Sequence, residues 1–186
     1  MCSSPIKAPD PSAERLALRT PGSSDYEALA SWVADASACV RWASPRLRFP
    51  FTAAELPELL AVPDAGSYCM SERDGKPLGF GQFWVVTAGA VHLGRIIVSP
   101  NERGRGLGKS LCELLIAEAV PATGATAVTL RVYLDNAPAL AVYSSLGFCI
   151  VESESTDEVF FMRAEANPSV GRTTAAKPVS AAHVKP

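Results

Sequence analysis

The sequence predicts an α+β domain, in which several antiparallel strands are combined with about four helices. Three candidate strands follow one another along the chain: residues 67–73, 77–89 and 90–98. An Asp-Gly pair at 74–75 and an Ala-Gly pair at 88–89 separate them, and such pairs favour the tight turns of an antiparallel meander. Helical patterns then begin at Leu107 and at Asn136.

The part of the chain before the meander is predicted to contain one strand and two helices. Residues 16–20, LALRT, form a short candidate strand, and residues 23–36 form a candidate helix with a serine cap. A connection rich in aromatic residues and proline, VRWASPRLRFPF, follows at 40–51. Residues 52–61 are predicted to form a second, short helix.

The part after the meander is predicted to run helix, strand, helix and hairpin. Apolar residues recur at helical spacing from Leu107, and we expect Pro121 to end that helix. Residues 125–134 are rich in β-branched side chains, which favour a strand. Residues 136–147 begin with an asparagine cap and an early proline and end in glycine, which is typical of a helix. The closing hairpin is predicted from two segments, 148–155 and 157–164.

Length and composition favour a single domain of ordinary size. The 186 residues suffice for one substantial core, which we expect at 15–165 between disordered ends at 1–14 and 166–186 that lack apolar periodicity. A formal net charge of -2 weighs against nucleic-acid binding. No apolar run reaches the roughly 20 residues of a membrane span. The five cysteines show no metal-site spacing, so we expect reduced thiols, no metal and a cytoplasmic location.

Residues 101–111, NERGRGLGKSL, combine three glycines with two arginines and a lysine at the start of a predicted helix. The free N–H groups and the dipole of a helix N-terminus favour an anion there. Glycines let a ligand approach the backbone closely, and basic side chains add charge-assisted hydrogen bonds. We therefore expect these residues to bind a phosphate group: Arg103, Gly104, Arg105, Gly106, Leu107, Gly108 and Lys109. A glycine-rich turn with solvated basic residues is the alternative.

Two common phosphate motifs do not fit this loop. A P-loop needs a glycine five positions before Gly108, where the chain has Arg103. A dinucleotide-binding G-x-G-x-x-G that starts at Gly104 needs a glycine at the position of Lys109.

The loop instead resembles the pyrophosphate loop of the GNAT superfamily of N-acetyltransferases, (Q/R)-x-x-G-x-(G/A), which matches residues 103–108. A second segment, DNAPALAVYSSLGF at 135–148, is similar to the late segment of that family, where a tyrosine follows an asparagine by seven residues. The resemblance covers about residues 15–163. It implies a mostly antiparallel mixed sheet of six to seven strands, splayed at a bulge.

The resemblance implies that acetyl-CoA is the cosubstrate, with its pyrophosphate on the amides of 104–109. The backbone of Ile96, Ile97 and Val98 is then expected to pair with the pantetheine arm, as an added strand does. Asn136 corresponds to a residue that contacts the arm, although its type also suits a helix cap. Tyr143 corresponds to the acid that protonates the departing thiolate, which is the interpretation that its spacing from Asn136 favours; a half-buried core tyrosine is the alternative.

The general base is less clear, because the chain departs from one subgroup of the family. Ribosomal-protein alanine acetyltransferases have a glutamate five residues before the asparagine, where this chain has Arg131, which cannot act as a base. Arylalkylamine acetyltransferases resemble the chain in placing a histidine at His92, for which we expect an ionisation near pH 6 to 8. A structural strand histidine is the alternative. Glu102 and Asp135 are lesser candidates for the base.

The acceptor site is expected next to the aromatic connection and Arg131. Trp42, Phe51 and Arg131 could hold an apolar amine or a substrate that carries a carboxylate, or the aromatic residues could simply fill the core. The leading hypothesis is an N-acetyltransferase for a small-molecule or peptide amine, acting by direct attack in a ternary complex, with homodimerisation left open. The alternative is an acyl-CoA-binding sensor that has lost catalysis.

Overall fold

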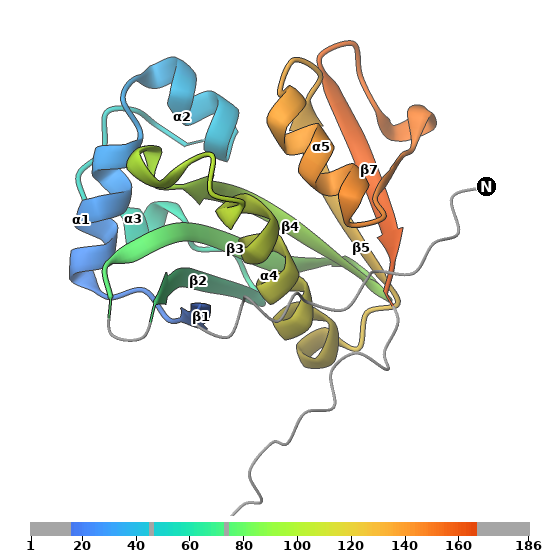
Figure 1. Ribbon diagram of the computed structural model, residues 1–186, viewed down its shortest axis with the longest axis horizontal. Helices are drawn as coiled ribbons and strands as arrows, with labels where there is room; N and C mark the ends of the chain where they lie inside the picture. Colours follow the sequence, from blue (N-terminus) through green and yellow to red (C-terminus); the bar gives the residue numbers. More distant parts are fainter. Residues whose placement is uncertain (1–15, 45–46, 73–74, 167–186) are drawn as a thin grey trace, which may run out of the picture.

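The computed structural model describes residues 16–44, 47–72 and 75–166 (Figure 1). Ala166, the first residue of the expected C-terminal tail, is buried. The rest of that tail and the N-terminal segment 1–14, both expected to be disordered, lie outside the described residues.

One mixed sheet of seven strands runs through the domain, in the order β1-β2-β3-β4-β5-β7-β6. Its strands are β1 (Leu16–Arg19), β2 (Ala65–Glu72), β3 (Pro77–Thr87), β4 (Ala90–Val98), β5 (Ala127–Tyr133), β6 (Cys149–Ile150) and β7 (Val159–Glu165). Neighbouring strands pair antiparallel everywhere except between β4 and β5, which are parallel. This confirms the predicted meander and the mostly antiparallel mixed sheet. The predicted closing hairpin is shorter on its first side, where only two residues form β6.

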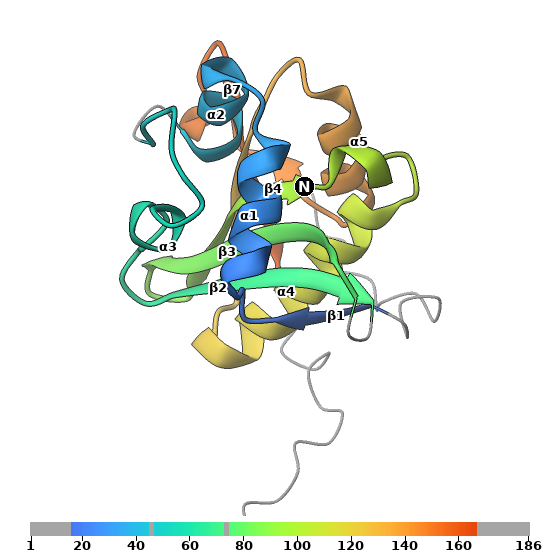
Figure 2. The same ribbon diagram turned by 90° about the vertical axis from the view of Figure 1, so that its left-hand side faces the viewer.

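Helices cover both faces of this sheet. They are α1 (Ser23–Trp32), α2 (Ala36–Ala43), α3 (Leu56–Leu59), α4 (Leu107–Thr123) and α5 (Ala137–Ser145), with short 3-10 turns η2 (Pro100–Glu102) and η3 (Glu152–Glu154). Helices α4 and α5 pack on one face around one buried cluster, which includes Leu111, Leu115 and Leu146. Helices α1, α2 and α3 pack on the other around Leu29, Leu56 and their neighbours (Figure 2).

Three of the predicted helices have different bounds in the structure. The helix expected at 52–61 is only the short α3, Leu56–Leu59. The single helix expected at 23–36 is two helices, because Val33 is extended and Asp35 starts α2 by accepting a 2.8 Å hydrogen bond from the Ala38 amide. Helix α4 continues past Pro121 to a C-terminal cap at Gly124, whose φ of 65° is left-handed. Pro121 lies in the last turn on the exposed side of the helix, where its ring is accommodated.

A β-bulge in β4 opens the middle of the sheet. The β3–β4 register changes from Phe80↔Ile97 to Gln82↔Gly94, so β4 has one residue more than β3 over this stretch. Arg95 lies in the bulge with a left-handed φ of 53°. Strands β4 and β5 pair only from Ala90↔Ala127 to His92↔Thr129, after which they diverge (Figure 1). We call the space between their C-terminal halves the gap; it confirms the expected splay at a bulge.

Three cysteines behave as expected, and one does not. Cys39, Cys69 and Cys112 are free and buried, and burial raises the pKa of each thiol. Cys149 is disulfide-bonded, so the expectation of reduced thiols is wrong for this residue. Within the described ranges, no helix is long and apolar enough to cross a membrane.

Candidate active site

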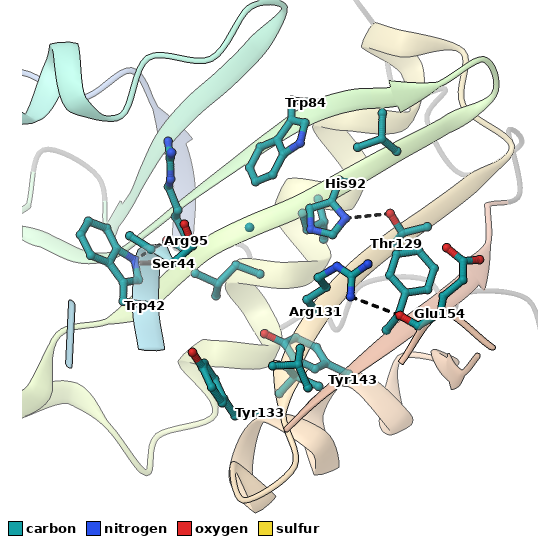
Figure 3. Close-up of a pocket in the computed structure, with 18 of the residues that line it drawn as sticks. Trp42, Ser44, Trp84, His92, Arg95, Thr129, Arg131, Tyr133, Tyr143 and Glu154 are labelled. Carbon is teal, nitrogen blue, oxygen red and sulfur yellow. Dashed lines mark hydrogen bonds between the residues drawn. The ribbon is translucent and has the colours of Figure 1, made fainter. Parts of the chain in front are cut away.

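A cavity of about 980 Å³ lies where β4 and β5 diverge (Figure 3). Its walls come from α2, β3, β4, β5, α5 and β7, so segments distant in the sequence meet there. Alternate residues of β3, β4, β5 and β7 line the cavity with side chains that point away from α4. We call the surface that they form the acceptor face; it consists of Trp84, His92, Thr129, Arg131, Phe161 and Arg163. Asn136 and Tyr143 of the α5 region line the opposite side.

The glycine loop has the backbone geometry of an anion site. Gly104 and Gly106 have left-handed φ angles of 80° and 77°, and a Cβ built at either would meet no protein atom within 4 Å. Gly106 is the N-cap of α4, so the free amides of the first helical turn begin there. The open space over these glycines is therefore available to a ligand, and a side chain at either position would enter it.

Two of the loop's basic side chains already have acidic partners. Arg105 forms an ion pair with Glu102. Lys109 Nζ lies 2.9 Å from Oε1 of Glu113, a buried carboxylate one turn further along α4. In the ligand-free protein Glu102 and Glu113 offset much of the positive charge of these two side chains, so a bound anion would compete with the carboxylates for them.

The end of β4 has one main-chain edge toward β3 and the other toward the gap. Side chains of Ile96 and Val98 pack against the α4 cluster, whereas Ile97 packs against the α1–α3 cluster. The side chains of these three residues therefore contribute to the core on both faces, and the main-chain edge is what they offer to a ligand in the gap.

The α5 residues of the second motif lie at the same cavity. Asn136 caps α5, because its Oδ1 accepts a 3.3 Å hydrogen bond from the Ala139 amide, and it also lines the cavity. Tyr143 is 8% exposed, and its ring meets Phe148 edge-on at 6.0 Å. Burial raises the pKa of Tyr143 well above its ordinary value, so its hydroxyl remains a proton donor at neutral pH.

His92 occupies the centre of the acceptor face. Its ring lies 5.0 Å from the Trp84 ring and 6.5 Å from the Phe161 ring, measured between centroids. His92 Nδ1 is hydrogen-bonded to Thr129 Oγ1 at 2.9 Å. The Thr129 hydroxyl donates its proton to the Val91 carbonyl oxygen, 3.5 Å away, so its oxygen is left to accept a hydrogen bond from His92. This favours the tautomer with a proton on Nδ1 and leaves Nε2 as the basic nitrogen.

Burial, and after it the charge of Arg131, lowers the pKa of His92 to about 4. The ionisation expected near pH 6 to 8 is therefore wrong for the ligand-free protein. The imidazole is neutral at physiological pH, but it is a weak base.

Arg131 projects from β5 beside His92 (Figure 3). Its guanidinium donates a 3.2 Å hydrogen bond to the Glu154 carbonyl and lies 5.0 Å from the centre of the Phe161 ring. Arg131 thus lines the cavity on this face, and its expected role in binding the substrate stays a prediction.

The α2 side of the cavity is held by two polar contacts. Trp42 Nε1 donates a 2.7 Å hydrogen bond to the Arg95 carbonyl, which ties α2 to the bulge. Arg41 forms a two-pronged ion pair with Asp135, at 2.6 and 3.1 Å, and so joins α2 to the β5–α5 connection. Trp42 lines the cavity, as the sequence analysis expected.

Phe51 does not share this position. Its ring packs edge-on against Phe49 in the α1–α3 cluster, 5.7 Å away between centroids, so its expected place in the acceptor site is corrected to the core. The lesser candidates for the base are also engaged, since Glu102 and Asp135 each accept hydrogen bonds from an arginine.

For several cavity residues, the neighbouring sequence does not predict a place at the site. Trp84 and Phe161 come to His92 because Trp84 pairs with His92 across β3–β4 and Phe161 pairs with Arg131 across β5–β7. Arg95 reaches inward from the bulge, where its guanidinium donates to the Leu60 carbonyl and to Gln82 Oε1 at 2.7 and 2.6 Å. Two-residue alternation along 127–133 and 159–165 could have suggested the shared face, but only the strand register identifies the partners.

Comparison with known proteins finds similar acetyltransferases. A relative from Nocardia farcinica (strain IFM 10152), L-2,4-diaminobutyric acid acetyltransferase, is 31% identical over 83 residues. The match covers 44% of this chain and 42% of that relative, so the chain spans less than half the length of this curated protein.

Solved structures with the same fold match over most of their length. The spermidine N-acetyltransferase from Vibrio cholerae, in complex with CoA and spermine, gives a TM-score of 0.68 at 16% identity, over 81% of this chain and 95% of that one. An aminoglycoside acetyltransferase in complex with coenzyme A gives a TM-score of 0.65 at 20% identity, over 81% and 94%. At these identities the likeness shows the fold. The model of the Acetyltransferase (GNAT) family matches residues 36–148, and the chain belongs to this family.

Proposed function

We propose that this protein transfers the acetyl group of acetyl-CoA to a primary amine, by direct attack within a ternary complex. The main support for the proposal is one continuous cavity. It is lined by Asn136 and Tyr143 at the gap and by His92 on the acceptor face. Family membership supports the reaction class, and the two structural neighbours are complexes with CoA, which supports the cosubstrate. The Nocardia relative, by its name, acts on an amine.

The cofactor is proposed to bind at the loop and in the gap. Its pyrophosphate lies over Gly104 and Gly106, where no protein atom fills the space, and accepts hydrogen bonds from amides of residues 104–108. The Lys109 amide, which the sequence also assigned to the pyrophosphate, already donates a 3.0 Å hydrogen bond to the Gly106 carbonyl. The pantetheine arm then extends along the inner main-chain edge of β4 at Ile96, Ile97 and Val98. Asn136, which also caps α5, contacts this arm from the opposite side of the gap.

Tyr143 is proposed as the proton donor of the reaction. The amine nitrogen attacks the thioester carbonyl carbon, and amides near the bulge stabilise the oxyanion that forms. Collapse of this intermediate breaks the carbon–sulfur bond, and the departing CoA thiolate takes the hydroxyl proton of Tyr143. Burial raises the pKa of Tyr143, which keeps its hydroxyl protonated at neutral pH but also makes it a weaker acid in the ligand-free protein. The transfer therefore depends on the negative charge that develops on sulfur beside the hydroxyl, and the phenolate then regains a proton from solvent.

His92 is proposed to accept a proton from the amine, and its low pKa determines at which step of the reaction it can do so. An imidazole with a pKa of about 4 cannot deprotonate a free ammonium ion efficiently. The nitrogen of the tetrahedral intermediate is far more acidic than free ammonium, because it is attached to an electron-poor carbon. His92 therefore takes its proton after attack, through Nε2 or an intervening water, and passes it to solvent.

A turnover assay tests this function against the sensor alternative. The protein is incubated with acetyl-CoA and a panel of amines, amino acids, polyamines, aminoglycosides and peptides, and free CoA is measured. Amine-dependent release of CoA is the expected result. Tight acetyl-CoA binding by calorimetry, together with no acceptor-dependent release of CoA, would reject the enzyme and favour the sensor. The weak base at His92 would then explain the missing turnover.

A further inference from the structure

The charged side chains of the cavity are almost all cationic. Of the charged residues that line it, four are arginines and one is acidic: Arg41, Arg95, Arg131, Arg163 and Glu154. Glu154 contacts Arg131 through its main-chain carbonyl, and the residue is exposed to solvent. Arg41 and Arg163 are ion-paired with Asp135 and Glu165, whereas the partners of Arg95 and Arg131 among the described residues are neutral. A polycation that entered this cavity would meet the like charge of these last two arginines in a partly desolvated space, which costs more there than in bulk water.

Three of the four arginines are already committed to partners. The guanidinium of Arg95 is bonded to the Leu60 carbonyl and the Gln82 side chain, beneath the bulge. Arg41 is bonded to Asp135 by both of its terminal nitrogens. Arg163 Nε lies 3.2 Å from a carboxylate oxygen of Glu165.

Arg131 differs from these three. In the described part of the chain, its one hydrogen bond goes to the neutral Glu154 carbonyl, at 3.2 Å. The ring of Phe161 lies 5.0 Å from its guanidinium carbon and holds the planar group flat. A guanidinium has five N–H donors in a rigid fork that matches a carboxylate, so several donors remain for a ligand.

The position of Arg131 places a bound carboxylate close to the proposed chemistry. Thr129 pairs with His92, and Arg131 is two residues further along β5 on the same face. Figure 3 shows the Arg131 and His92 side chains next to each other in the cavity, and the charge of Arg131 contributes to lowering the pKa of His92. A molecule with its carboxylate on Arg131 can therefore place its amine near His92 only if the two groups are a few bonds apart.

The aromatic rings around His92 suit the remainder of such a molecule. Trp84 and Phe161 lie on either side of the imidazole, at centroid distances of 5.0 and 6.5 Å. They provide an apolar surface for a short hydrocarbon portion, whereas a long polyamine would require acidic groups spaced along the cavity.

We propose that the acceptor is a small amino acid whose carboxylate binds the guanidinium of Arg131, and that polyamines and aminoglycosides are poor acceptors. This inference rests on the proposed acetyltransferase function and specifies its substrate class. Binding of the carboxylate also neutralises the charge that Arg131 presents to His92, so the substrate itself makes the imidazole a better proton acceptor.

Matched substrates test the inference directly. Each amino acid of a panel is compared with its carboxamide and with the amine that remains after decarboxylation, and spermidine and an aminoglycoside are included. The expected result is a kcat/KM for the best amino acid at least about tenfold above that of its carboxamide, because a charged hydrogen-bond partner is lost. Arg131→Gln should remove this preference, mainly by raising KM, and leave the Kd for acetyl-CoA unchanged.

Arg163→Gln serves as the matched variant, because it removes one positive charge from the same face at a residue already paired with Glu165. It should retain the preference for the free carboxylate. A polyamine as the best acceptor, or a carboxylate preference that survives in Arg131→Gln, would overturn the substrate class but keep the acetyltransferase. No CoA release with any acceptor, in protein that binds acetyl-CoA, would overturn both proposals.

Discussion

Replacing Gly106 by alanine should separate cofactor binding from folding. A Cβ at this position enters open space over the loop and touches no protein atom within 4 Å, so the variant suffers no internal clash. The cost to folding is the left-handed φ of 77°, which disfavours alanine by about 1–2 kcal/mol. The methyl group occupies the space proposed for the pyrophosphate. Loss of one charge-assisted bond of about 1.5–3 kcal/mol would weaken acetyl-CoA binding by roughly 10- to 100-fold.

Gly124→Ala is the matched control for this substitution. Gly124 lies at the other end of α4 with a φ of 65°, and a Cβ there also meets no protein atom within 4 Å. Urea denaturation should show similar losses of stability in the two variants, whereas calorimetry should show weaker acetyl-CoA binding only for Gly106→Ala. Parental affinity in Gly106→Ala, or an equal loss in Gly124→Ala, would refute the pyrophosphate site at the loop.

Three further substitutions test the remaining parts of the site. Tyr143→Phe should lower the rate of acetyl transfer by ~10²–10⁴-fold with an unchanged Kd for acetyl-CoA, and a single-turnover rate within about twofold of the parent would make this tyrosine structural. Because the native pKa of His92 is about 4 and the unfolded value is about 6.5, the unfolded chain binds an extra proton between these pH values, and stability falls as the pH drops through them. His92→Gln should remove at most about 3 kcal/mol of that fall, measured by urea denaturation at several pH values, and parallel curves for the two proteins would contradict the buried neutral imidazole. Trp42→Phe removes the donor to the Arg95 carbonyl and should cost about 1 kcal/mol of stability together with a lower kcat/KM, so an unaffected kcat/KM would exclude a role for this bond in shaping the site.

Features of the fold and site that depend on neighbouring residues could be predicted from the sequence. The glycine loop, the α5 motif and the meander are each specified within about a dozen residues, by turn chemistry, caps and spacing. The break between α1 and α2 was also readable, since Asp35 is a favoured cap, but the continuous apolar pattern concealed it.

Features that depend on pairing between distant strands could not be predicted. Trp84 and Phe161 reach His92 only through the β3–β4 and β5–β7 registers. In the sequence, Trp42 and Phe51 belong to the same aromatic connection, and nothing there predicts that they lie in different places. In the structure, α2 extends to Ala43, and Trp42 on this helix is hydrogen-bonded to the bulge. The low pKa of His92 likewise follows from burial, which the sequence does not report.

The short pairing between β4 and β5 also bears on self-association. Two strand edges with unused main-chain groups normally invite pairing with other chains and lead to aggregation. Here the edges face each other inside the domain, where they diverge after His92↔Thr129, and the ion pair between Arg41 and Asp135 links α2 to the β5–α5 connection across the gap. The protein thereby keeps an open β-edge, where the pantetheine arm is proposed to bind, in a place that a strand from another molecule cannot easily reach.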